Sequence, residues 1–168
     1  MESRYKLLGH PIHPMLIPYP LALLSTAAVF DVIGLLTRDG MWHTVAFWMI
    51  AAGLIVGLVA ALFGLLDFLN IPGQTRAKSV ALTHGIGNVV VVVLFAASWW
   101  LRTGNVPDPG LLPIVLGLLG AGLVGVTAWL GGELPYRLGI GIDEGANPDA
   151  SNSLSHEPIR IGDRAARP

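Results

Sequence analysis

Four long apolar runs dominate the pattern of hydrophobic and polar positions. They cover residues 15–36, 44–69, 80–101 and 111–130, and few polar side chains interrupt them. About 20 mostly apolar residues are enough for a helix to cross ~30 Å of hydrocarbon. Because a backbone in lipid must satisfy its own hydrogen bonds, each run predicts a transmembrane helix. The sequence therefore predicts an all-α membrane protein with four spans.

The connections between the runs contain the residues that end helices. Pro and Gly occur in the 70–73 and 102–110 connections, and Gly131-Gly132 follows the fourth run. Short connections make consecutive helices antiparallel, which predicts an up-down four-helix bundle over residues 1–142. Residues 143–168 are rich in Asn, Asp, Ser, Gly and Pro, which predicts a disordered tail.

Composition supports the membrane assignment and excludes several functions. Of the 168 residues, 12% are charged and 53% are hydrophobic, whereas soluble domains average about 25% charged residues. A net charge of -1 provides no overall basic surface for nucleic acid. Because the chain has no cysteine, it cannot form disulfides, Fe–S clusters or thiolate zinc sites. The expected partner is the lipid bilayer, together with a redox partner or a second copy of the chain.

Basic residues predict the orientation of the spans. Four spans place both termini on one side, here called side A, together with the 70–79 connection. Near the membrane, side A carries five basic residues and the opposite side B carries two. Lys and Arg favour the cytoplasmic face, so both termini are predicted to be cytoplasmic. The side A residues are Arg4, Lys6, Arg76, Lys78 and Arg137, and the side B residues are Arg38 and Arg102.

Ionisable residues near the spans gather on side A. Such residues are costly in a membrane and usually face a bundle interior or a cavity. Because His10 and His13 each precede a proline, we expect both in an extended lip, with Pro14 near the first helical position. Asn88 lies one turn beyond His84, on the same helix face. The side A set is His10, His13, Asp67, His84 and Glu133.

Three interpretations of the side A set remain open. Imidazole and carboxylate groups are ordinary ligands of a transition-metal ion. A b-type haem could instead take His84 and either His10 or His13 as axial ligands, with the acids supporting them. In the third interpretation, His–acid pairs only lock the helix ends, because buried polar groups in membranes usually pair.

Two further patterns concern packing and symmetry. Each predicted hairpin begins with histidine on side A and ends with an acid, Asp67 or Glu133, which suggests a parallel repeat about an axis along the membrane normal. On side B, Asp31 either pairs with His43 or forms a proton or ion site alone. Small residues recur every fourth position and predict close helix packing inside the bundle or at a dimer face: Gly53, Gly57, Ala61, Gly117, Ala121 and Gly125.

Several motifs resemble one membrane-protein family. They are His10-Pro11-Ile12-His13-Pro14-Met15-Leu16-Ile17-Pro18 with a later Asp31, Gly64-Leu65-Leu66-Asp67-Phe68, His84-Gly85-Ile86-Gly87-Asn88, and the segment from Gly131 to Ile142. Together they resemble the family catalogued as Domain of Unknown Function 2231, except that Pro135 stands where an apolar residue is expected. The resemblance implies a prokaryotic four-helix membrane protein, and we expect the cytoplasmic (inner) membrane as its location. Some relatives are joined to Rieske-type iron–sulfur domains, which implies membrane electron transfer.

The sequence thus leads to two hypotheses of different classes. The first is a haem b or metal site on side A that serves redox chemistry. Its ligands would be His10, His13 and His84; Asp67 and Glu133 would ligate or orient them; Asn88 and Tyr136 would support them. The second is a non-enzymatic scaffold or small transporter in which the same cluster is a structural lock or a polar pathway.

Overall fold

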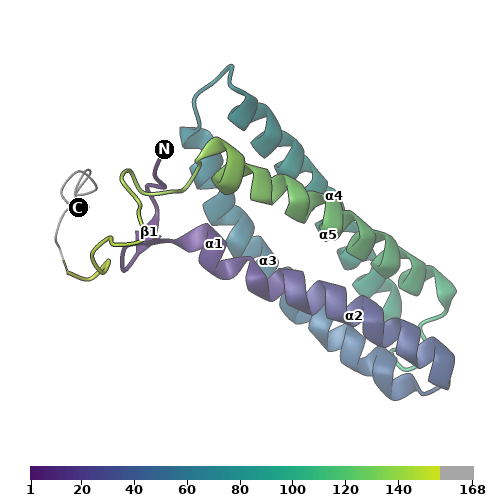
Figure 1. The fold of residues 1–168 in the computed structure, drawn as a ribbon. Coiled ribbons are helices and arrows are strands. Elements are labelled where there is room, and N and C mark those ends of the chain that lie inside the picture. The colour runs from purple at the N-terminus through teal and green to yellow at the C-terminus, as the bar shows by residue number, and fades with distance from the viewer. Residues whose placement is uncertain (156–168) are drawn as a thin grey trace.

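The computed structural model describes residues 1–155 and contains four helices long and apolar enough to cross a membrane (Figure 1). A short helix, α1, leads into α2, and the two together make the first span. The prediction of an all-α four-span protein is confirmed. The elements are β1 (Lys6–Leu7), β2 (His10–Pro11), α1 (Ile12–Leu16), α2 (Pro18–Thr37), α3 (Gly40–Asn70), α4 (Arg76–Arg102) and α5 (Leu111–Leu138).

The bundle consists of two antiparallel hairpins packed side by side. Helices α2 and α3 form the first hairpin and α4 and α5 the second; α3 contacts α4, and α2 contacts α5 (Figure 1). Side A holds the start of α1, the α3–α4 connection and the end of α5. The central core joins both hairpins and comprises the buried residues Leu24, Ala27, Ala46, Ile50, Val91, Phe95 and Val124.

The fourth span is longer than the sequence predicts. Helix α5 does not close at Gly131-Gly132 but continues through Pro135 to Leu138, where Gly139 adopts the left-handed conformation (φ 65°). Proline removes one helical hydrogen bond, and each interior glycine costs about 1 kcal/mol. Packing offsets these costs, because Leu134 and Leu138 lie against a buried cluster on side A. Glu133, predicted just past the helix, therefore lies inside it.

The extended lip is confirmed at His10 but not at His13. His10 and Pro11 pair with β1 as a short antiparallel strand, and Pro11 has extended dihedral angles. His13 lies in α1, although it precedes Pro14. Proline is tolerated in the first helical turn, where its missing N–H would have no helical partner. The two histidines therefore belong to different elements.

The segment after α5 folds back onto the N-terminus. Asp143 forms an ion pair with Lys6, and the Glu144 backbone N–H donates to Glu2 at 2.8 Å. The Glu144 N–H, assisted by Lys6, lowers the pKa of Glu2, and the hydrogen bond with Asp143 raises the pKa of Lys6. The predicted disorder of 143–168 stays a prediction, since residues 156–168 lie outside the described residues.

Candidate functional site between the two hairpins

His13 is tied to the first hairpin through its ring. Its Nδ1 lies 2.8 Å from the Ala60 carbonyl oxygen on α3. Gly64, one turn further along α3, makes room for the ring, since a Cβ there would lie 2.9 Å from Cε1 of His13. A carbonyl oxygen can only accept a hydrogen bond, so Nδ1 carries the proton. In the neutral form of this ring, the lone pair is therefore on Nε2.

His84 repeats this arrangement in the second hairpin. Its Nδ1 lies 2.8 Å from the Thr127 carbonyl oxygen on α5. Gly131 makes room for this ring, because a Cβ there would lie 2.9 Å from Cε1 of His84. Each hairpin thus holds one imidazole, through the same ring nitrogen and a backbone carbonyl.

The match extends along the whole bundle. Gly53 packs against Leu24 in the first hairpin, and Gly120 packs against Phe95 in the second. Two constant offsets relate the hairpins. An offset of 71 residues relates α1 and α2 to α4, at positions 13 and 84, 24 and 95, and 31 and 102. An offset of 67 residues relates α3 to α5, at positions 53 and 120, 60 and 127, and 64 and 131. The hairpins are therefore structural repeats that run in the same direction through the membrane. The sequence analysis treats Asp67 and Glu133 as equivalent ends of the two hairpins, but the offset of 67 residues makes Leu134 the equivalent of Asp67.

The other predicted site residues either have different partners or are exposed. Asp67 accepts a hydrogen bond from Ser3 at 2.6 Å, and Glu133 pairs with Arg76 at 2.8 Å. His10 is exposed on β2, and Tyr136 is 87% exposed at the end of α5. Among residues 1–155, no three His, Asp or Glu side chains gather in a way that could hold a metal ion.

Asn88 covers the imidazole of His84. Its Nδ2 lies 3.1 Å from Nε2 of His84 and also donates to the His84 backbone carbonyl at 3.0 Å. The amide can therefore leave Nε2 and keep a hydrogen bond within its own helix. Of the predicted supporting residues, Asn88 is the one in contact with a histidine of this pair.

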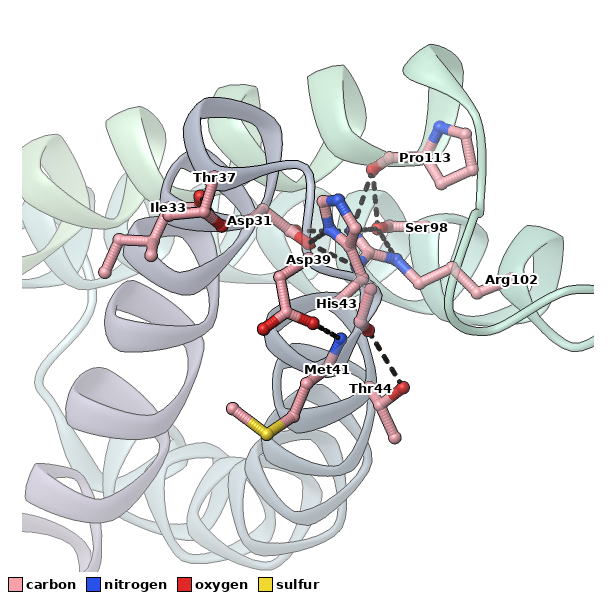
Figure 2. Close-up of polar contacts among 11 residues, drawn as sticks. Asp31, Ile33, Thr37, Asp39, Met41, His43, Thr44, Ser98, Arg102 and Pro113 are labelled. Carbon is pink, nitrogen blue, oxygen red and sulfur yellow. Dashed lines mark hydrogen bonds and ion pairs between the residues drawn. The ribbon is translucent and has the colours of Figure 1, made fainter.

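A second polar cluster is buried at side B (Figure 2). Arg102 donates from Nη1 and Nη2 to the two carboxylate oxygens of Asp31, at 2.7 and 2.6 Å. The predicted pairing of Asp31 with His43 is confirmed at 2.9 Å. Ser98 accepts from Arg102 and donates to the Pro113 carbonyl at 2.7 Å. Asp31 is 1% exposed and Arg102 is fully buried, so the charges neutralise each other inside the bundle.

Sequence reasoning missed Arg102 and Ser98. Arg102 was assigned to the side B connection, but it is the last residue of α4 and points into the bundle. Its spacing was informative, because residues 13 and 31, and residues 84 and 102, are both 18 apart. The repeat thus places Asp31 and Arg102 at equivalent positions with opposite charges.

Comparison with known proteins adds the family. A family model described as "Predicted membrane protein (DUF2231)" matches residues 9–144. The chain belongs to this family. No curated protein and no solved structure matched the chain. In this member of DUF2231, the matched region includes both histidines with their carbonyl partners and the whole side B cluster.

The glycine beside each imidazole gives a first testable prediction for this DUF2231 protein. Gly131→Ala should lower the free energy of unfolding by about 1–3 kcal/mol, because the new Cβ displaces the His84 ring from the Thr127 carbonyl. Reversible unfolding in mixed detergent micelles measures the change. Gly125→Ala is the matched control on the same helix, since no atom lies within 4 Å of a Cβ placed there. Equal stability of the two variants would contradict the prediction.

Proposed function

We propose that this protein transfers electrons in the membrane, and that His13 and His84, one from each hairpin, would hold a haem b. The observation that carries the proposal is the matched pair of Nδ1 hydrogen bonds to backbone carbonyls, both 2.8 Å long. Metal-ligating histidines almost always donate their other ring N–H to a carbonyl, a carboxylate or water. Both rings meet this condition.

The number of available ligands favours haem over a bare metal ion. A mononuclear metal site commonly draws three or more protein ligands, and no three suitable His, Asp or Glu side chains gather within residues 1–155. Haem supplies four nitrogens of its own and needs only one or two from the protein. One histidine from each hairpin matches that requirement, with His13 rather than the exposed His10 facing the bundle.

The chain's residues would hold such a group and orient its ligands. When held by both imidazoles, the haem would supply one-electron transfer. The carbonyl oxygens of Ala60 and Thr127 fix the ring tautomers and increase the basicity of Nε2. Asn88 would give up its contact with Nε2 of His84 and keep its bond to the His84 carbonyl. Asp67 and Glu133, which have other partners, would have no ligand role.

The absorption spectrum of the wild-type protein tests the proposal. Protein purified in mild detergent from a haem-replete host should show a Soret band, a sharp α band after reduction and about one haem per chain by pyridine haemochrome assay. The competing possibility, favoured by the same hydrogen bonds, is that the histidines only lock the helices of a scaffold or transporter. Folded protein that takes up no haem even after addition of hemin would establish that possibility and refute ours.

We also propose that side A faces the cytoplasm. The buried ion pair supports this orientation, because Arg102 is neutralised by Asp31 inside the bundle and does not act as a loop charge. Of the two basic residues assigned to side B, only Arg38 is then exposed. The excess of Lys and Arg on side A is therefore larger than the sequence count indicates.

A further inference from the structure

A shallow surface hollow lies at the side A end of α5, and neither His13 nor His84 lines it. It has a volume of about 410 Å³ and is lined by Arg76, Trp129, Glu133 and Arg137. An adjoining hollow of about 470 Å³ shares the last three residues and adds Gly132 and Tyr136. The two hollows together are here called the α5 pocket. It joins the start of α4 to the last turns of α5, where both helices leave the membrane.

The charges of the α5 pocket favour an anion. Arg76 is paired with Glu133 at 2.8 Å, so these two charges offset each other. Arg137 is exposed, and its guanidinium makes no hydrogen bond or ion pair with residues 1–155. Guanidinium groups bind phosphate oxygens in a bidentate manner. The pocket thus carries one uncompensated cationic group suited to a phosphate.

The neighbouring surface indicates that this phosphate belongs to a lipid. Trp129 and Tyr136 are 67% and 87% exposed, which is typical of aromatic residues at the level of lipid headgroups. Gly122 and Gly125 lie on the same face of α5, toward the bilayer centre, and no atom lies within 4 Å of a Cβ placed at either. The two glycines therefore form a shallow strip on the lipid-facing surface, bordered by the exposed side chains of Val126 and Trp129.

We propose that the α5 pocket binds an anionic phospholipid. Its phosphate contacts Arg137 and the outer N–H groups of Arg76, and one acyl chain lies over Gly125 and Gly122. A headgroup that also carries an ammonium group fits less well, because that cation would approach the two arginines. Free phosphate lacks the acyl chain that would occupy the strip along α5.

Native mass spectrometry of delipidated protein in non-ionic detergent tests the proposal. Phosphatidylglycerol should be retained at least about fivefold better than phosphatidylcholine. Arg137→Gln should reduce that retention about fivefold, and Arg38→Gln, an exposed arginine at side B, should leave it unchanged. Glu133→Gln should increase retention, because it removes a negative charge from the pocket and frees Arg76.

Four results would overturn the proposal. They are equal retention of the two lipids, equal effects of Arg137→Gln and Arg38→Gln, weaker retention by folded Glu133→Gln protein, and complete displacement of the lipid by inorganic phosphate. The last result would assign the pocket to a free anion. Circular dichroism establishes that each variant is folded, and Arg137→Gln removes no contact within residues 1–155.

Discussion

Replacing Asp31 with alanine should lower the free energy of unfolding by about 3–5 kcal/mol. The substitution leaves the fully buried Arg102 without its carboxylate partner, and an unpaired charge inside a membrane bundle is expensive. It also removes the acceptor of His43 Nδ1. Because Asp31 lies on α2 and Arg102 on α4, the loss should separate the two hairpins at side B rather than unwind either one.

Denaturant titration in mixed micelles, followed by circular dichroism, measures this effect. Asp39→Ala is the matched control, because Asp39 is an exposed aspartate at the same end of the bundle that caps α3 through the Met41 N–H. Losing such a cap costs about 1 kcal/mol. Similar losses for Asp31→Ala and Asp39→Ala would show that the buried ion pair is unimportant for stability.

A double variant distinguishes the stability contributed by the ion pair from that contributed by the neighbouring residues. Asp31→Leu with Arg102→Met removes both charges and fills much of their volume with apolar atoms. Exchanging a buried ion pair for apolar residues is often close to neutral, whereas removing one partner is strongly destabilising. The double variant should therefore recover more than half of the stability lost in Asp31→Ala, with the remaining loss arising from His43. Additive losses would mean that the two residues act independently.

The equivalence of Asp31 and Arg102 explains why this pair is suited to holding the hairpins together. Two identical hairpins would place like charges at these positions, near the axis that relates them. A carboxylate on one hairpin and a guanidinium on the other turn that repulsion into a bidentate contact. The opposite charges also make the association specific, because each hairpin then binds the other hairpin better than it binds a second copy of itself.

The sequence predicts the fold well because membrane helices are determined by simple physics. Apolar runs of sufficient length must be helical in lipid, and all four spans follow from that requirement. The helix ends are less predictable. Gly131 and Gly132 act as stop signals in isolation, but packing of Leu134 and Leu138 extends α5 past them. At this end of α5, tertiary contacts outweigh the low helix propensity of the two glycines.

The polar sites are predicted only in part, because a sequence does not show which partner each polar side chain finds. His13 and His84 have backbone carbonyls as partners, and any residue at positions 60 and 127 supplies a carbonyl. The informative signal is the glycine one turn later, at Gly64 and Gly131. Arg102 was missed because an arginine at the end of an apolar run usually reaches the surface of the membrane.

Removing either histidine of the pair should abolish the haem spectrum proposed for this protein. His13→Ala and His84→Ala each leave one of the two imidazoles that would hold the haem, so the Soret and α bands should fall below about a tenth of their wild-type intensity. His10→Ala is the matched control, because His10 is exposed on β2 three residues before His13. It should retain the full spectrum.

The two substitutions should affect the spectrum equally, because the histidines occupy equivalent positions in the two hairpins and have the same hydrogen bond. A structural lock would behave differently: His84→Ala would lower stability, and hemin would leave all variants spectrally identical. A haem retained by His13→Ala but lost from His10→Ala would show that His10 on β2, and not His13, holds the haem. Redox titration provides an independent measurement, because Asn88→Ala removes the amide beside His84 but neither histidine, and should therefore shift the midpoint potential of the haem.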